Sequence, residues 1–437
     1  MSKFRLLIML LCAALWACVL SAQTPMRMTL DELFNRAEEH SARLATERKA
    51  MDEASAAVRE ARAARLPNLD LNLSASYLGN GCLTDRDFGN GQNISMPHWG
   101  NNFAIEASQL IYGGGAVQRQ IDLARQAEQL TSLHLSATRS EVRFVLTGYY
   151  LELCKLENLL QVYDQHIALT ERLIVDTRLR HVQGLVLQND ITRFELQIEE
   201  LRLARTRVEN ARSIIQSDLC TTLHLPAETL IVPDTTSLAT PYTMEGEGFW
   251  QASAEESSHA IRQSELGVEM SRTSEELARA ARRPKVSLFA ANHFDGPITI
   301  EVPVINKNFN YWMVGVGVSI PISALYKANK SIRRAEQHTA YSERRLIETE
   351  EQVEQAIRSD YIRYREAFTE VETWQKSVEL ALENYAVVEN RYRNDVALIT
   401  DMLDASAQKL EAELQLTNAR INTRYRYYKL CFVAGTL

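Results

Sequence analysis

Two aspartates stand three residues apart near the C-terminal end of the chain, at Asp401 and Asp404. Residues with this spacing are neighbours on one face of a helix. If several copies of the chain surrounded a pore, these carboxylates would form two rings of negative charge, and such rings select cations. A simpler interpretation is helix capping, because Thr400 could cap the helix and an aspartate in a first turn favours the helix dipole. The two interpretations are compatible.

The other motifs do not predict a catalytic or metal site. His166 and His181 lack the H-E-x-x-H spacing of a zinc site, and Gly113 to Gly115 are not followed by the Lys-Ser/Thr of a phosphate-binding loop. A net charge of −8 argues against a nucleic-acid partner, because phosphate binding usually needs a basic face. We therefore expect a protein that is not an enzyme and that holds no cofactor or metal.

The N-terminus predicts export. Lys3 and Arg5 precede an apolar run that ends near Leu20, so residues 1–22 are typical of a signal peptide cut after Ala22. An alternative is a lipoprotein signal in which Cys18 is lipidated. No later stretch approaches the ~20 apolar residues of a membrane helix, so the exported chain is either soluble or crosses a membrane as β-strands. The remaining cysteines are expected to be small buried thiols: Cys82, Cys154, Cys220 and Cys431.

The chain repeats itself once. The segment Ala61–Pro67 recurs as Ala278–Pro284. We therefore expect a first repeat at residues 23–225, an irregular linker at 226–248 and a second repeat at 249–437. Later matches between the two repeats lie 211 residues apart: Ser108 and Ser319, Val142 and Val353, Arg180 and Arg391, Asp190 and Asp401.

Each repeat is expected to contain two long coiled-coil helices. No proline occurs between Pro97 and Pro226 or after Pro321, and helix interiors exclude proline. Apolar residues recur every seven positions, which is typical of a coiled-coil seam. A helix over 115–183 would be roughly 100 Å long, too long for a compact globule. The expected helices span about 115–183, 189–224, 325–394 and 400–434, and one heptad series is Leu153, Leu160, Ile167 and Ile174.

Strict alternation of apolar and polar residues predicts short strands. Leu69, Leu71 and Leu73 alternate with polar neighbours, as in a strand with one apolar face. A length of about ten residues suits a tilted membrane strand. Four strands cannot close a barrel, so membrane insertion would require oligomerisation, and three copies would supply twelve strands. The alternative is a small soluble sheet packed on the helices. The expected strands span about 68–78, 102–112, 285–294 and 311–322.

With these features the chain resembles the outer-membrane efflux protein (TolC) family over nearly all of its exported length. The segment Tyr392–Ala405 is similar to the family's second periplasmic helix turn, and Gly184-Leu185 is similar to its tip motif. The resemblance implies a mainly α fold with a membrane β part. Three copies would share a twelve-stranded β-barrel that continues into an α-helical tunnel. It also implies the cell outer membrane as location, with a long periplasmic portion.

The resemblance further implies roles for particular residues. Val396 and Ala397 would join Gly184 and Leu185 in contacting an adaptor at the periplasmic tip. The family's best-known member has a gate-locking arginine at the position of Ala397, and alanine cannot make that contact. Tyr392 and Asp190 could still pair across neighbouring helices. The channel gate and its selectivity would depend on Asp401, Asp404, Asp190 and Tyr392.

The expected function is therefore a passive export channel in the outer membrane. It would serve a tripartite efflux pump or a type I secretion system. Its partners would be a periplasmic membrane-fusion adaptor and an inner-membrane RND or ABC pump. The channel itself would be a homotrimer. The alternative is a periplasmic coiled-coil scaffold or adaptor without a pore. Two full repeats with alternating strands favour the channel.

Overall fold

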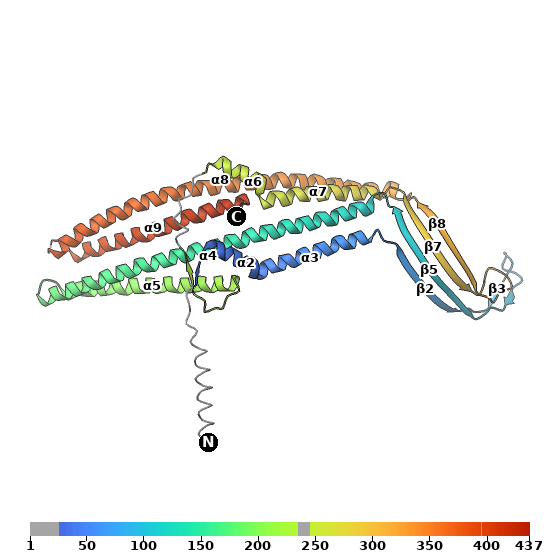
Figure 1. Ribbon diagram of the computed structural model, residues 1–437, viewed down its shortest axis with the longest axis horizontal. Coiled ribbons are helices and arrows are strands. Elements are labelled where there is room, and N and C mark those ends of the chain that lie inside the picture. Colours follow the sequence, from blue (N-terminus) through green and yellow to red (C-terminus); the bar gives the residue numbers. More distant parts are fainter. Residues whose placement is uncertain (1–25, 235–244, 395) are drawn as a thin grey trace, which may run out of the picture. The chain divides into compact units, whose positions relative to one another are not determined.

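The computed structural model describes residues 26–234, 245–394 and 396–437 (Figure 1). The expected signal peptide, with Cys18, and Asp395 lie outside the described residues. The chain forms two compact units. The helical unit contains the described residues up to Arg48, together with His134–Arg262 and Thr349–Leu437, and the sheet unit contains Lys49–Leu133 and Gln263–Glu348. Each unit takes a part of both repeats, so neither repeat folds as a domain of its own.

The sheet unit is built on four antiparallel strands, in the order β2-β5-β7-β8 (Figure 1). Leu71 lies opposite Ile105, which lies opposite Asn292, and this register sorts the alternating residues onto two faces. One face exposes large apolar side chains, among them those of Leu69, Val314 and Trp312. The strands are β2 (Asn68–Tyr77), β5 (Trp99–Tyr112), β7 (Lys285–Gly296) and β8 (Phe309–Ser319).

The other face of this sheet is mainly polar. The Asn102 side-chain amide donates to Asp295 Oδ1 over 2.6 Å, and the Tyr311 hydroxyl group lies 3.4 Å from Asp295 Oδ2. Gly315 leaves room for the Phe289 ring, which an added Cβ would meet at 2.6 Å. Among the described residues, β2 and β8 each pair with one strand of this sheet, so both outer edges are open.

Shorter elements flank the sheet in the chain. The strands β3 (Gly81–Leu83) and β4 (Gln92–Ile94) form a hairpin between β2 and β5. In both repeats a helix of 22 residues precedes the first long strand. These helices are α3 (Ala42–Ala63) and α7 (His259–Ala280), each of which follows a shorter helix, α2 (Leu30–His40) or α6 (Glu247–Ser257).

Four long helices dominate the chain, which confirms a mainly α fold with a small β part. They form two hairpins, one of α4 and α5 and one of α8 and α9 (Figure 1). In the part of the chain that the structure describes, no helix is apolar enough over a sufficient length to cross a membrane. The helices are α4 (Ala116–Val182), α5 (Gln188–Thr222), α8 (Ala324–Arg393) and α9 (Ile399–Ala434).

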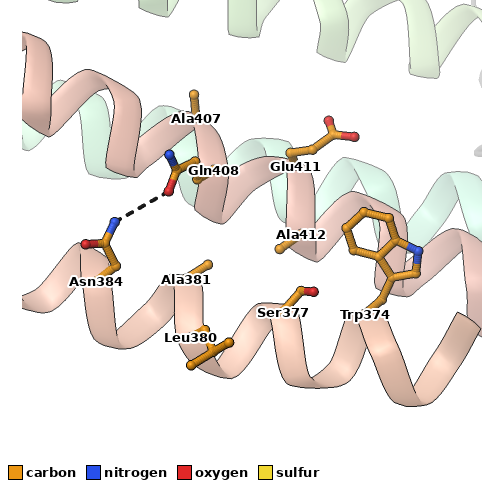
Figure 2. Close-up of a pocket in the computed structure, with 9 residues that line it drawn as sticks. All are labelled: Trp374, Ser377, Leu380, Ala381, Asn384, Ala407, Gln408, Glu411 and Ala412. Atoms are coloured by element: carbon orange, nitrogen blue, oxygen red, sulfur yellow. Dashed lines mark hydrogen bonds between the residues drawn. The ribbon is translucent and has the colours of Figure 1, made fainter.

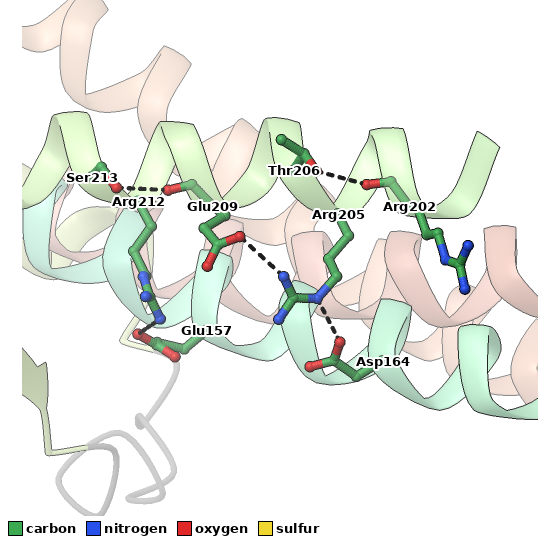
Figure 3. Close-up of polar contacts among 8 residues, drawn as sticks. All are labelled: Glu157, Asp164, Arg202, Arg205, Thr206, Glu209, Arg212 and Ser213. Atoms are coloured by element: carbon green, nitrogen blue, oxygen red, sulfur yellow. Dashed lines mark hydrogen bonds and ion pairs between the residues drawn. The ribbon is translucent and has the colours of Figure 1, made fainter. Parts of the chain in front are cut away.

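Ion pairs join the two helices of the first hairpin. Arg205 Nε lies 2.6 Å from Asp164 Oδ1, and Arg212 Nη1 lies 3.2 Å from Glu157 Oε1 (Figure 3). Arg202 also pairs with Glu171, at 3.1 Å. Glu157, Asp164 and Glu171 are seven residues apart, so they project from one side of α4. Exposed pairs of this kind add little stability, and we infer that they mainly fix the register of the hairpin.

Apolar packing in the helical unit is concentrated in separate clusters. The first cluster brings α2, α4 and α5 together around Leu33, Leu146 and Leu219, which are fully buried. The strand β1 (Met26–Met28) adds to it by pairing in parallel with β6 (Ile231–Pro233). The strand β6 lies within the interval 226–248, where the sequence indicated an irregular linker.

The cysteines only partly follow expectation. Cys154, Cys220 and Cys431 are buried, and burial raises the pKa of the Cys154 thiol to about 12. Cys82 is exposed on β3, so the expectation of a buried thiol is wrong there. Its strand belongs to the short two-stranded hairpin of β3 and β4.

The first cluster allows a matched test of packing. Leu146 is fully buried, whereas its neighbour Val145 on the same helix is exposed. Leu146→Ala should lower the free energy of unfolding by about 2–5 kcal/mol, because it removes buried contacts and leaves a cavity. Thermal unfolding in detergent, followed by circular dichroism at 222 nm, would measure the change. Val145→Ala should leave the transition almost unmoved, and equal effects of the two changes would contradict the assignment of this core.

Candidate functional site at the hairpin turns

The turn between α4 and α5 is closed by a glycine. Gly184 adopts a φ of +78°, a left-handed conformation that other residues rarely adopt. Its N–H donates to the His181 carbonyl over 2.9 Å, and the Leu185 N–H donates to the Arg180 carbonyl over 3.0 Å. These two bonds satisfy carbonyl groups that the end of a helix otherwise leaves without partners.

The turn between α8 and α9 repeats part of this arrangement. The Val396 N–H donates to the Arg391 carbonyl over 2.8 Å. Val396 and Arg391 lie 211 residues beyond Leu185 and Arg180, so the two repeats close their turns with equivalent bonds. Asp395, the counterpart of Gly184, lies outside the described residues.

Asp190 and Asp401 cap the helices that leave the two turns. Asp190 Oδ2 accepts a hydrogen bond from the Leu187 N–H over 3.1 Å, and Asp401 Oδ2 accepts one from the Leu398 N–H over 3.0 Å. Each aspartate is the third residue of its helix and reaches back to the residue before the helix. The expectation that Thr400 caps α9 is wrong, because the helix begins at Ile399 and Thr400 already lies inside it.

Asp404 lies one helical turn beyond Asp401, and both side chains are exposed. Its Oδ2 atom accepts a hydrogen bond from the Gln408 side-chain amide over 2.8 Å. Both carboxylates therefore stand on the first two turns of α9 in contact with solvent. The charge rings expected from the sequence stay a prediction.

Tyr392 connects the two hairpins. The side chain is buried, and its hydroxyl group lies 3.3 Å from Thr177 Oγ1 on α4. The Arg180 guanidinium lies 5.2 Å from the centre of the Tyr392 ring, and its Nη1 donates to the Tyr392 carbonyl over 2.9 Å. The Phe194 ring packs edge-on at 6.3 Å. The carboxylate of Asp190 instead accepts a hydrogen bond from the Leu187 N–H at the start of its own helix. Within one chain, Tyr392 therefore contacts Thr177 and Arg180 of α4.

Thr177 and Arg180 are the site residues that sequence reasoning missed. Thr177 stands in a heptad series as a polar residue at a core position, and Arg180 matched Arg391 in the repeat. Both features can be found in the sequence, but no local sequence pattern indicates that the ends of α4 and α8 approach each other.

The two turns expose a group of apolar side chains, hereafter the tip patch. It includes Leu185 and Val396, two of the residues expected to contact an adaptor, and Gly184 and Ala397 lie in the same turns. Exposed apolar groups that cluster in this way typically mark an interaction site. The tip patch consists of Val182, Leu185, Leu187, Val396 and Leu398. Among the described residues, no group of three or more His, Cys, Asp or Glu side chains could hold a metal ion.

Comparison with known sequences shows which proteins this chain is similar to. Residues 250–436 match the family described as outer membrane efflux protein. The outer membrane protein TolC of Vibrio cholerae is 20% identical over 409 residues, which cover 93% of this chain and 91% of that protein. TolC of Salmonella enteritidis is 21% identical over 189 residues, 42% of this chain, and the match spans only 38% of that relative's length. The resemblance inferred from the sequence is therefore confirmed.

A solved structure gives the same result for the fold. The outer membrane protein VceC from Vibrio cholerae superposes with a TM-score of 0.76 at 14% sequence identity. The alignment covers 93% of this chain and 96% of that one. The expected fold class is thereby confirmed for the single chain.

The capping role of Asp401 is directly testable. Asp401→Ala should weaken the start of α9 by about 0.5–2 kcal/mol, or roughly 2- to 30-fold in the exchange rate of nearby amides. Hydrogen–deuterium exchange of a peptide covering residues 396–402 would report it. Asp404→Ala is the matched control, because the hydrogen bond of Asp404 goes to a side chain. Equal exchange in both variants would argue against the cap.

Proposed function

We propose that this chain, similar in sequence and fold to the outer membrane efflux proteins, is an outer-membrane channel. It would be a passive export conduit of a tripartite efflux pump or type I secretion system, driven by an inner-membrane partner. One observation carries the proposal. A four-stranded antiparallel sheet with an exposed apolar face and two open edges occurs in the same chain as two long helical hairpins.

The sheet supports a barrel shared between copies. Its four strands alternate in direction, so β8 of one copy and β2 of the next are antiparallel and can pair. Closure of the sheets into a barrel would give hydrogen-bond partners to the backbone groups at the open edges, and lipid offers no such partners. Three copies give twelve strands, with the apolar face toward lipid and the polar face toward the pore. A periplasmic scaffold without a pore would have no use for this exposed apolar face.

The gate would lie at the hairpin turns. In a homotrimer, Asp401 and Asp404 would each form a ring of three carboxylates that attracts cations. Asp190 would hold the start of α5, as Asp401 holds the start of α9. Tyr392, held by Thr177 and Arg180, would fix the end of α8 against α4 in the resting state.

The tip patch would be the contact for a periplasmic membrane-fusion adaptor. Gly184 keeps the first turn tight, and Leu185, Val396 and Ala397 lie in the two turns that such a partner would meet. An adaptor would cover the exposed apolar side chains. An inner-membrane RND or ABC pump would complete the assembly.

Channel activity can be measured with the detergent-purified protein in a planar lipid bilayer. We expect stable, cation-selective conductance steps. The double change Asp401→Asn with Asp404→Asn should reduce cation preference, seen as a smaller reversal potential in a salt gradient. Asp176→Asn, an exposed carboxylate elsewhere on α4, is the control and should change little. A monomeric, water-soluble protein without conductance would refute the channel.

The tip patch predicts a specific binding defect. Leu185→Asp combined with Val396→Asp would place charges in the apolar contact and should weaken adaptor binding by about 10- to 100-fold. Affinity can be measured by surface plasmon resonance with the detergent-solubilised channel. Ile214→Asp alters an exposed apolar residue far along α5 from the turn and should bind normally. If only this control lost binding, the contact would lie elsewhere.

A further inference from the structure

The exposed apolar face of the sheet continues along β8 to the start of α8, which follows it directly in the chain (Figure 1). Every second side chain here is apolar and exposed, as alternation along a strand predicts. The first turn of α8 adds Leu325 and Tyr326, which are 55% and 64% exposed. The alternating row consists of Trp312, Val314, Val316, Val318, Ile320 and Ile322.

Basic residues follow this apolar row without a gap. The first eleven residues of α8 contain four basic residues and no acidic residue. All four side chains are exposed, and among the described residues none of them forms an ion pair with a carboxylate. The three at positions 327, 330 and 334 share one face of the helix. The basic residues are Lys327, Lys330, Arg333 and Arg334.

The internal repeat shows that a long helix can start at this place without these residues. Subtracting 211 from their positions gives the start of α4, which is a helix of 67 residues. The difference between the two repeats therefore indicates a role in binding rather than in folding. Smaller residues stand at the equivalent positions: Gly114 for Leu325, Gly115 for Tyr326 and Ala116 for Lys327.

The basic residue that both helix starts share is neutralised in the first repeat. Arg119 is the counterpart of Lys330, and its Nε atom lies 2.6 Å from Glu276 Oε2. Its Nη1 atom lies 3.4 Å from Asp122 Oδ2. The counterpart of Asp122 is Arg333, so positive charge accumulates at the start of α8 instead of being compensated.

Positive charge gathers at this end of the sheet and not at the other. The strand register brings the ends of all four long strands to one edge, next to the four helices. The exposed residues Arg62, Arg65 and Lys285 add to the charge at this edge. At the opposite edge acidic and basic residues nearly balance, with Asp85, Asp87 and Glu301 against Arg86 and Lys307.

We propose that residues 322–334, hereafter the anchor segment, bind anionic phospholipid headgroups at the membrane surface. Leu325 and Tyr326 enter the edge of the lipid layer, and Lys327 and Lys330 hold the phosphate groups. A tyrosine beside lysines whose apolar stems lie along lipid is the pattern of a membrane interface. The proposal rests on the proposed function, which places the apolar face of the sheet in lipid.

The proposed barrel adds a second reason for an anionic ligand. Pairing of β8 with β2 of the next copy brings the start of α8 close to the end of that copy's α3, which carries Arg62 and Arg65. Like charges at such a place repel one another. A phosphate-bearing headgroup between them offsets the repulsion, and its acyl chains remain beside the apolar row. A soluble anion would leave Leu325 and Tyr326 exposed to water.

Native mass spectrometry of the detergent-purified protein can measure lipid binding. The protein is titrated separately with phosphatidylglycerol, which is anionic, and with phosphatidylcholine that has the same acyl chains. We expect tighter binding of phosphatidylglycerol. Lys327→Gln with Lys330→Gln should weaken that binding by roughly 30-fold, about 5-fold per lysine, and leave phosphatidylcholine unaffected. An unchanged preference in this variant would overturn the proposal.

Two further variants test whether charge at this position is the cause. Lys327→Arg with Lys330→Arg keeps both charges and should keep the preference for phosphatidylglycerol. Lys307→Gln with Lys376→Gln removes the same net charge at exposed sites away from the anchor segment, and it should also keep the preference. An equal loss in this control would show an effect of net charge alone and would overturn the proposal.

The apolar part of the anchor segment has its own test. Leu325→Ser with Tyr326→Ser should lower the affinity for both lipids to a similar extent, because the lost contacts are with acyl chains. Glycerol 3-phosphate carries the headgroup's charge without acyl chains, so it should not displace phosphatidylglycerol from the wild-type protein. Displacement at equal concentration would indicate a site for soluble phosphate and would overturn the membrane role.

Conductance measured on the same preparations separates this proposal from the channel itself. Conducting trimers that bind both lipids equally would overturn the role of the anchor segment and leave the channel standing. A preference for phosphatidylglycerol that depends on Lys327 and Lys330, in a protein without conductance, would support the anchor segment and count against the channel. A water-soluble monomer that binds neither lipid would overturn both.

Discussion

The structure depends on one constraint: within the described parts of the chain, β2 and β8 each have a neighbouring strand on one side only. Each strand leaves a row of backbone N–H and C=O groups at the edge, and the sheet also exposes apolar side chains on one face. In lipid each unsatisfied backbone group costs several kcal/mol, so a single chain of this form is incomplete. The proposed assembly of several copies would satisfy the edges, and it would also bring the hairpins of the different copies together around an axis.

Much of the fold could be predicted because its periodicities are local. Missing prolines and seven-residue spacing indicated the long helices, and two-residue alternation indicated the strands. Thr400 was misjudged because helix starts depend on one or two residues of backbone geometry, and α9 starts at Ile399. The contact of Tyr392 with Thr177 and Arg180 joins segments about two hundred residues apart, and no local pattern carries that information.

The two repeats share a backbone plan but differ in chemistry. Their turns place Asp190 and Asp401 at equivalent caps. The ion pairs of Arg205 and Arg212 occur in the first hairpin, whereas leucine and threonine stand at the equivalent positions of α9. The surroundings of the two hairpins also differ, since His166 on α4 contacts Glu413 of α9, whereas its counterpart Ser377 on α8 lines an open groove (Figure 2). Divergence after duplication is expected to follow such differences in surroundings.

The caps at the two turns have a mechanical consequence. Since the carboxylates of Asp190 and Asp401 bond to the backbone of their own helices, each hairpin end keeps its hydrogen bonds whatever its neighbours do. The turn ends of the two hairpins could therefore move apart as rigid bodies, without unfolding a turn of helix. The resistance to such a movement comes from the contacts between the hairpins near the turns, which include the packing of Phe194 on Tyr392 and the hydrogen bond and ring contact of Arg180 with Tyr392. Widening this end of the molecule is then a matter of breaking side-chain contacts rather than refolding backbone.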